Sequence, residues 1–62
     1  MFISYKESQD KIDAILDWAN ENYWFDTGFV DSLSEQLERK GRLTDNQESA
    51  LDNLIEKFDI NY

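Results

Sequence analysis

The side chains of this sequence that could take part in chemistry are almost all carboxylates. The 62 residues include 14 Asp and Glu against 6 Lys and Arg, with no His and no Cys, and the formal net charge is −8. Paired carboxylates can hydrolyse glycosides or hold divalent cations, but a cleft or a loop must first orient them. A chain this short offers no cleft for a sugar or a phosphate.

Other kinds of catalytic and cofactor site are excluded by composition. The thiolate and histidine groups of common nucleophilic and zinc sites are missing. The segment 45–56 begins and ends with an acid, as a calcium loop does, but it has no glycine at its sixth position. Two glycines, Gly28 and Gly41, cannot build a phosphate-binding loop. We therefore expect no enzyme, no metal ion and no cofactor.

The carboxylates recur at steps of three or four residues, about one for each 5.4 Å turn of a helix. The rows are Asp10, Asp13, Asp17 and Glu21; then Asp31, Glu35 and Glu38; then Asp45, Glu48, Asp52, Glu56 and Asp59. Like charges at this spacing destabilise a helix by about 0.2–0.5 kcal/mol per pair. The rows indicate either a surface that imitates nucleic-acid phosphates and binds a basic protein, or a solvated face that keeps the chain soluble.

Three helices are needed to position these rows. The sequence has no proline, and its two glycines separate three segments with helical periodicity, at about 5–22, 29–40 and 45–58. No useful alternation of period two predicts a strand. We expect one all-α domain over residues 1–62, a compact three-helix bundle whose second and third helices form its most secure part.

Each segment carries apolar residues on one face, and these predict the core. They are Ile12, Ile15, Leu16, Ala19 and Tyr23; then Phe29, Val30, Leu33 and Leu37; then Leu51, Leu54, Ile55 and Phe58. After the third segment, Ile60 or Tyr62 can pack back onto the bundle.

The ends of the segments carry helix-capping residues. Ser4 with Glu7, and Thr44 with Gln47, are spaced as capping boxes, and Asp26 or Thr27 can cap the second segment. Gly41 can end that segment in the left-handed conformation.

Three aromatic residues admit two interpretations. Trp18 is predicted beside the first acidic row, and it is either a binding hot spot or part of the core. Trp24 and Phe25 lie in the connection after the first segment, and the favoured interpretation is that they fold over the open end of the core.

A resemblance adds to this reading. The stretch Phe29–Leu51 resembles a helical-hairpin motif, F-x-x-S-L-x-x-Q-L-x-x-x-G-x-L-T-x-x-Q-x-x-A-L, that occurs in phage-encoded and bacterial proteins, some of them linked to nucleic-acid metabolism. It covers about a third of the chain. The resemblance implies a small phage accessory protein of the host cytoplasm and no catalytic residue.

The resulting hypothesis is an inhibitor that covers the basic, nucleic-acid-binding surface of a host protein such as a nuclease, a defence effector or a polymerase. The expected partner-binding residues are Asp10, Asp13, Asp17, Trp18, Glu21, Trp24, Asp45, Glu48, Asp52 and Glu56. The alternative is a structural or adaptor module that self-associates, as a homodimer, or binds a partner through its aromatic residues. Net negative charge disfavours direct nucleic-acid binding through Arg39, Lys40 and Arg42 and disfavours anionic membranes, and no apolar run is long enough for a membrane span.

Overall fold

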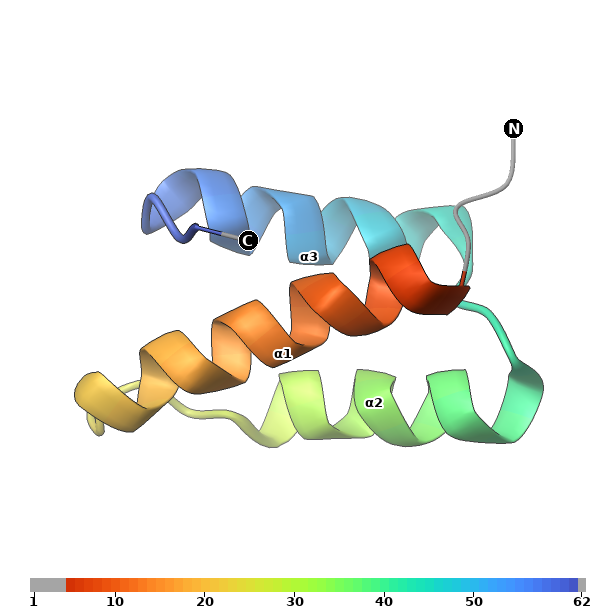
Figure 1. Ribbon diagram of the computed structural model, residues 1–62, viewed down its shortest axis with the longest axis horizontal. Helices are drawn as coiled ribbons and strands as arrows, with labels where there is room; N and C mark the ends of the chain where they lie inside the picture. The colour runs from red at the N-terminus through yellow and green to blue at the C-terminus, as the bar shows by residue number, and fades with distance from the viewer. Residues whose placement is uncertain (1–4, 62) are drawn as a thin grey trace.

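The computed structural model describes residues 5–61, and within them it contains three helices and no strand. The helices are α1 (Tyr5–Glu21), α2 (Gly28–Lys40) and α3 (Asp45–Lys57) (Figure 1). Each boundary falls within one residue of the segments predicted from periodicity. The prediction of an all-α three-helix bundle is confirmed.

Helix α1 is the central element of the bundle. It lies between α2 and α3 and packs against both, whereas α2 and α3 hardly contact each other (Figure 1). The prediction that α2 and α3 form the most secure pair is therefore wrong. The chain turns tightly between them, but each of these two helices packs mainly against α1.

The core is assembled from the predicted faces of all three helices. Its buried members are Ile12, Ile15, Val30, Leu33, Leu37, Leu43, Leu51 and Ile60, with Leu16, Leu54, Ile55 and Phe58 half-buried against them. Two predicted core residues are wrong. Tyr23 is 94% exposed because α1 has already ended at Glu21, so the helical periodicity no longer applies to it. Phe29 is 52% exposed because it is rotated by about 100° from the buried Val30.

The ends of α2 and the start of α3 follow the predicted capping chemistry in most respects. Gly41 has a φ of 80°, and its N–H donates to the Leu37 carbonyl at 2.7 Å. Thr44 and Gln47 form the capping box, with both reciprocal hydrogen bonds present. At the start of α2 the hydroxyl of Thr27 makes no cap, and Asp26 Oδ1 instead accepts the N–H of Gly28 at 2.9 Å. The other predicted box requires Ser4, which lies outside the described residues.

The chain reverses after α3 and returns to the core. Asp59 takes a φ of 52°, which allows the N–H of Ile60 to reach the Ile55 carbonyl at 2.9 Å. This is the Schellman arrangement, with Asp in the position that glycine usually fills. The predicted packing of Ile60 is confirmed, since its side chain is buried. Tyr62 lies outside the described residues.

Candidate interaction surface

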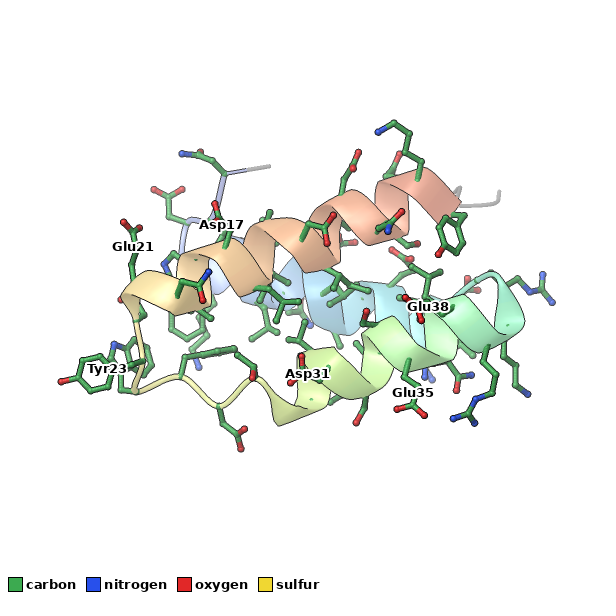
Figure 2. All side chains as sticks on the ribbon, turned by 60° about the horizontal axis from the view of Figure 1, so that its bottom comes forward. Asp17, Glu21, Tyr23, Asp31, Glu35 and Glu38 are labelled. Atoms are coloured by element: carbon green, nitrogen blue, oxygen red, sulfur yellow. The ribbon has the colours of Figure 1, made fainter. Side chains whose placement is uncertain are left out.

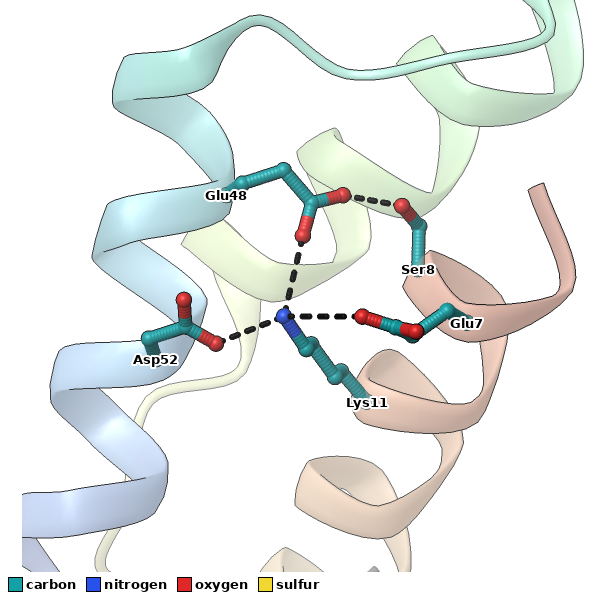
Figure 3. A network of polar contacts seen from close by, with 5 residues as sticks. All are labelled: Glu7, Ser8, Lys11, Glu48 and Asp52. Atoms are coloured by element: carbon teal, nitrogen blue, oxygen red, sulfur yellow. Dashed lines mark hydrogen bonds and ion pairs between the residues drawn. The ribbon is translucent and has the colours of Figure 1, made fainter. Parts of the chain in front are cut away.

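Lys11 is the most buried charged residue among those that the structure describes, and it connects α1 to α3. The side chain of Lys11 on α1 is 3% exposed, and its Nζ lies 3.3 Å from Glu48 Oε2 and 2.7 Å from Asp52 Oδ1, both on α3 (Figure 3). Glu7, one turn earlier on α1, lies 3.9 Å away. The hydroxyl of Ser8 donates to the other oxygen of Glu48. We call these five residues the Lys11 network.

The carboxylates around Lys11 stabilise its charged form. Burial by itself lowers the pKa of the ammonium, but hydrogen bonds and the charges of Asp52 and Glu48 outweigh burial and raise the pKa above its ordinary value. No buried side-chain nitrogen or oxygen within residues 5–61 lacks a hydrogen-bond partner. The network therefore satisfies the groups that folding has removed from water.

The Lys11 network corrects the predicted acidic row of the third helix. Glu48 was expected on the outside as a partner-binding residue, but it is only 5% exposed and faces α1. Asp52 is half-exposed and has its carboxylate on Lys11. Of the predicted residues of α3, Asp45 and Glu56 remain exposed without an ion pair in the described part of the chain. The row is broken because its middle residues meet a buried lysine, which helical spacing alone did not reveal.

The rows of α1 and α2 do lie on the outside. Asp13, Asp17 and Glu21 are exposed, and they have no ion-pair partner among residues 5–61. Asp10 is also exposed, at 3.5 Å from Lys6. Such exposed pairs hold a carboxylate only weakly. From its middle to its C-terminal end, α1 therefore presents the carboxylates of Asp13, Asp17 and Glu21 to solvent.

Helix α2 carries exposed carboxylates of its own, and Figure 2 shows it in front of α3. Its exposed carboxylates are Asp31, Glu35 and Glu38. Asp31 accepts the Thr27 hydroxyl at 3.1 Å, and Glu35 pairs with Arg39 one turn later. We define the acidic face as Asp13, Asp17 and Glu21 of α1 together with Asp31, Glu35 and Glu38 of α2.

The aromatic residues separate into an inner and an outer group. Trp18 stacks on Phe58 with ring centroids 4.8 Å apart, and it meets Phe25 edge-on at 5.2 Å. Trp18 is half-buried and packed against the core, so its position favours the core interpretation over the hot spot. The prediction that Phe25 folds over the core is confirmed. Trp24 contacts these rings at 5.8 Å and 5.9 Å but remains 62% exposed, so it is only partly inside.

The outer group consists of the exposed aromatic residues Tyr23, Trp24 and Phe29. Of these, Tyr23 and Phe29 were assigned to the core by periodicity. The turn Asn22–Phe25 is closed by a hydrogen bond from the Phe25 N–H to the Asn22 carbonyl at 2.9 Å. Tyr23 and Trp24 occupy its two central positions, and Tyr23 is exposed at the tip (Figure 2). The one sequence signal that α1 stops before Tyr23 is Asn22, because asparagine is common directly after a helix.

Comparison of the chain with protein-family models, with curated proteins and with solved structures gives no match. Within residues 5–61, no helix has the length and apolar character that crossing a bilayer requires.

Proposed function

We propose that this protein binds the basic, nucleic-acid-binding surface of another protein and inhibits it by covering that surface. The observation that supports the proposal is the acidic face, in particular the row Asp13, Asp17 and Glu21, which is exposed and has no ion-pair partner among residues 5–61. A Lys- or Arg-lined groove built for phosphates would attract such a row. The proposed host is a cell invaded by a phage, as the resemblance of the α2–α3 segment implies.

The spacing of the row is compatible with phosphate mimicry. Carboxylates four residues apart on a helix are separated by about 6 Å along its axis. Phosphates on one strand of duplex DNA rise by about 3.4 Å each, so the row approximates every second phosphate. The contribution of α3 is smaller than the sequence predicts, because Glu48 and Asp52 belong to the Lys11 network. Asp45 and Glu56 would add peripheral charge only.

The cost of the row to the isolated chain also supports a binding role. Asp13 and Asp17, and Asp17 and Glu21, are like-charge pairs at i,i+4, and each pair destabilises α1 by about 0.2–0.5 kcal/mol. A marginally stable domain of this length would gain from a lysine in the row. Mere solubility does not require uninterrupted repulsion along one helix, since mixed charges serve it as well.

The experiment has two stages. The tagged protein is first used to capture partners from a host lysate at low salt, after nuclease treatment, and bound proteins are eluted with a salt gradient and identified. Each candidate is then tested for binding to a fluorescent DNA duplex with increasing amounts of wild type or of the triple variant D13N/D17N/E21Q. The control variant is Lys6→Gln/Asp10→Asn, which keeps the net charge and removes only a weak exposed pair.

The proposal expects wild type to displace the duplex, with an apparent affinity that falls steeply as salt increases. The triple variant should compete much more weakly and with a shallower salt dependence, whereas the control should match wild type. Displacement that is equal for all three proteins, or insensitive to salt, would refute the charge-based mechanism.

A second candidate function is self-association through the outer aromatic residues. It is favoured by the exposure of Tyr23, Trp24 and Phe29, at 94%, 62% and 52%. Elution from a sizing column should then move to larger size as protein concentration rises, and Tyr23→Ser should abolish that movement. An elution volume independent of concentration would rule this function out.

A further inference from the structure

The turn Asn22–Phe25, which follows α1, has three properties that the charge-based proposal does not explain. It presents an aromatic ring almost entirely to solvent, it is held in one shape, and it is flanked by negative charge. The ring is that of Tyr23, which is 94% exposed and has no aromatic contact among the described residues. It contributes almost nothing to the core, so its place in the fold does not explain its size.

The turn is fixed at both ends. At its start, Asn22 donates from Nδ2 to the Trp18 carbonyl at 2.9 Å, and its N–H reaches the Ala19 carbonyl at 3.0 Å. At its end, the ring of Phe25 packs edge-on against both Trp18 and Phe58, with ring centroids 5.2 Å and 5.7 Å apart. A side chain presented on a turn held in this way loses little backbone freedom on binding, which favours affinity.

The charged residues that flank the turn in sequence are all negative, and the nearest base on the aromatic cluster is Lys57, whose Nζ lies 5.4 Å from the centroid of Phe58. Glu21 precedes it, Asp26 follows it, and Asp17 lies one helical turn before Glu21 and is labelled with it at the same end of the molecule as Tyr23 (Figure 2). All three carboxylates are exposed. The other five bases of the chain are Lys6 and Lys11 in the first half of α1 and three around Gly41.

We infer that Tyr23 is the anchor residue through which this protein binds an arginine-bearing segment of its partner protein. The carboxylates of the acidic face would bind the same segment. A guanidinium group stacks flat on an aromatic ring while its N–H groups donate to carboxylates, and an ammonium group cannot do both as well. The exposed carboxylates that flank Tyr23 in sequence would therefore favour arginine over lysine. Tyrosine is also among the residues most often found at binding hot spots. This inference rests on the proposed function, and it names the residue and the chemistry that would give it specificity.

The test uses two fluorescent peptides, a deca-arginine and a deca-lysine, because they carry equal charge and differ only in the cation. Their binding to the intact chain is measured by anisotropy over a range of salt concentrations. The variants are Tyr23→Ser and, as a matched control, Tyr5→Ser, which removes a 41% exposed tyrosine from the first turn of α1, at the opposite end of that helix. Helical circular dichroism verifies that each variant is folded.

We expect wild type to prefer deca-arginine and Tyr23→Ser to weaken that complex about five- to thirtyfold, the range typical of an aromatic anchor. The loss for deca-lysine should be smaller, and the salt dependence should not change, because no charge is removed. Tyr5→Ser should behave as wild type.

The failure of the inference can be distinguished from that of the proposed function. If Tyr23→Ser leaves deca-arginine binding intact while D13N/D17N/E21Q weakens it, the anchor is refuted and the charge-based function stands. If neither variant weakens binding of either peptide, both are refuted. If Tyr23→Ser changes only the concentration dependence of the chain's own elution, the ring serves a second copy of the chain and the inference is overturned.

Discussion

The Nζ of Lys11 and Oε2 of Glu48 lie 3.3 Å apart inside the molecule, with side chains 3% and 7% exposed. This contact joins α1 to α3 across 37 residues of sequence. Two charges removed from water are tolerated only when both are paired and hydrogen-bonded. The contact between these helices therefore depends on a matched pair as well as on apolar packing.

Lys11→Met should be strongly destabilising, because it leaves Glu48 buried without its cation. Breaking one partner of such a pair costs about 3–5 kcal/mol, which is a large share of the stability of a domain this small. Urea unfolding followed by circular dichroism measures the change. The triple variant S8A/K11M/E48L, which leaves no buried polar group behind, should recover wild-type stability or exceed it. Lys6→Met is the exposed control and should change stability by less than about 1 kcal/mol.

The stability should also fall in strongly alkaline solution. The pKa of Lys11 is raised in the folded chain above its ordinary value of 10.5. The stabilisation linked to its charge is therefore complete below the unfolded pKa and is lost as pH rises through the folded pKa. The difference in unfolding free energy between wild type and S8A/K11M/E48L should be constant through neutral pH and should shift against wild type above about pH 10.5. The comparison cancels the ionisation of tyrosines common to both proteins. A difference that does not change with alkaline pH would contradict this assignment.

Gly41→Ala should destabilise the turn between α2 and α3 for a backbone reason alone. A Cβ at this position would meet no atom within 4 Å, but the φ of 80° is unfavourable for an L-residue. The left-handed conformation costs roughly 1–2 kcal/mol. Gly41→Asn should cost less, since asparagine tolerates this conformation better. Thermal unfolding of the two variants checks the order, and equal losses would indicate a cause other than φ.

Asp17→Asn should raise the stability of the isolated protein although it removes part of the acidic face. It relieves repulsion with Asp13 and Glu21, each worth about 0.2–0.5 kcal/mol. Asp10→Asn should show no such gain, because Asp10 lies 3.5 Å from Lys6. Urea midpoints of the two variants test the difference. A loss of stability in Asp17→Asn would mean that this carboxylate has a structural role in the fold.

The sequence alone predicted the three helices, because their determinants are local. Apolar periodicity, the Thr44–Gln47 capping box and the glycine that ends α2 all act within a few residues, and the structure confirms each of them. Spacing also placed Asp13, Asp17 and Glu21 opposite the apolar face of α1, where they are exposed.

The tertiary structure decided which side chains of each helix meet another helix. Spacing predicted that Glu48 is exposed like its neighbours in the acidic row. In the structure α3 packs with this side chain toward Lys11, and that packing removes it from solvent. Likewise Tyr23 was assigned to the core by periodicity, and the turn closed by Asn22 and Phe25 turned it outward instead. The position of Glu48 depends on a contact with a residue 37 positions away, and that of Tyr23 depends on where α1 stops, and the periodicity of a single helix records neither.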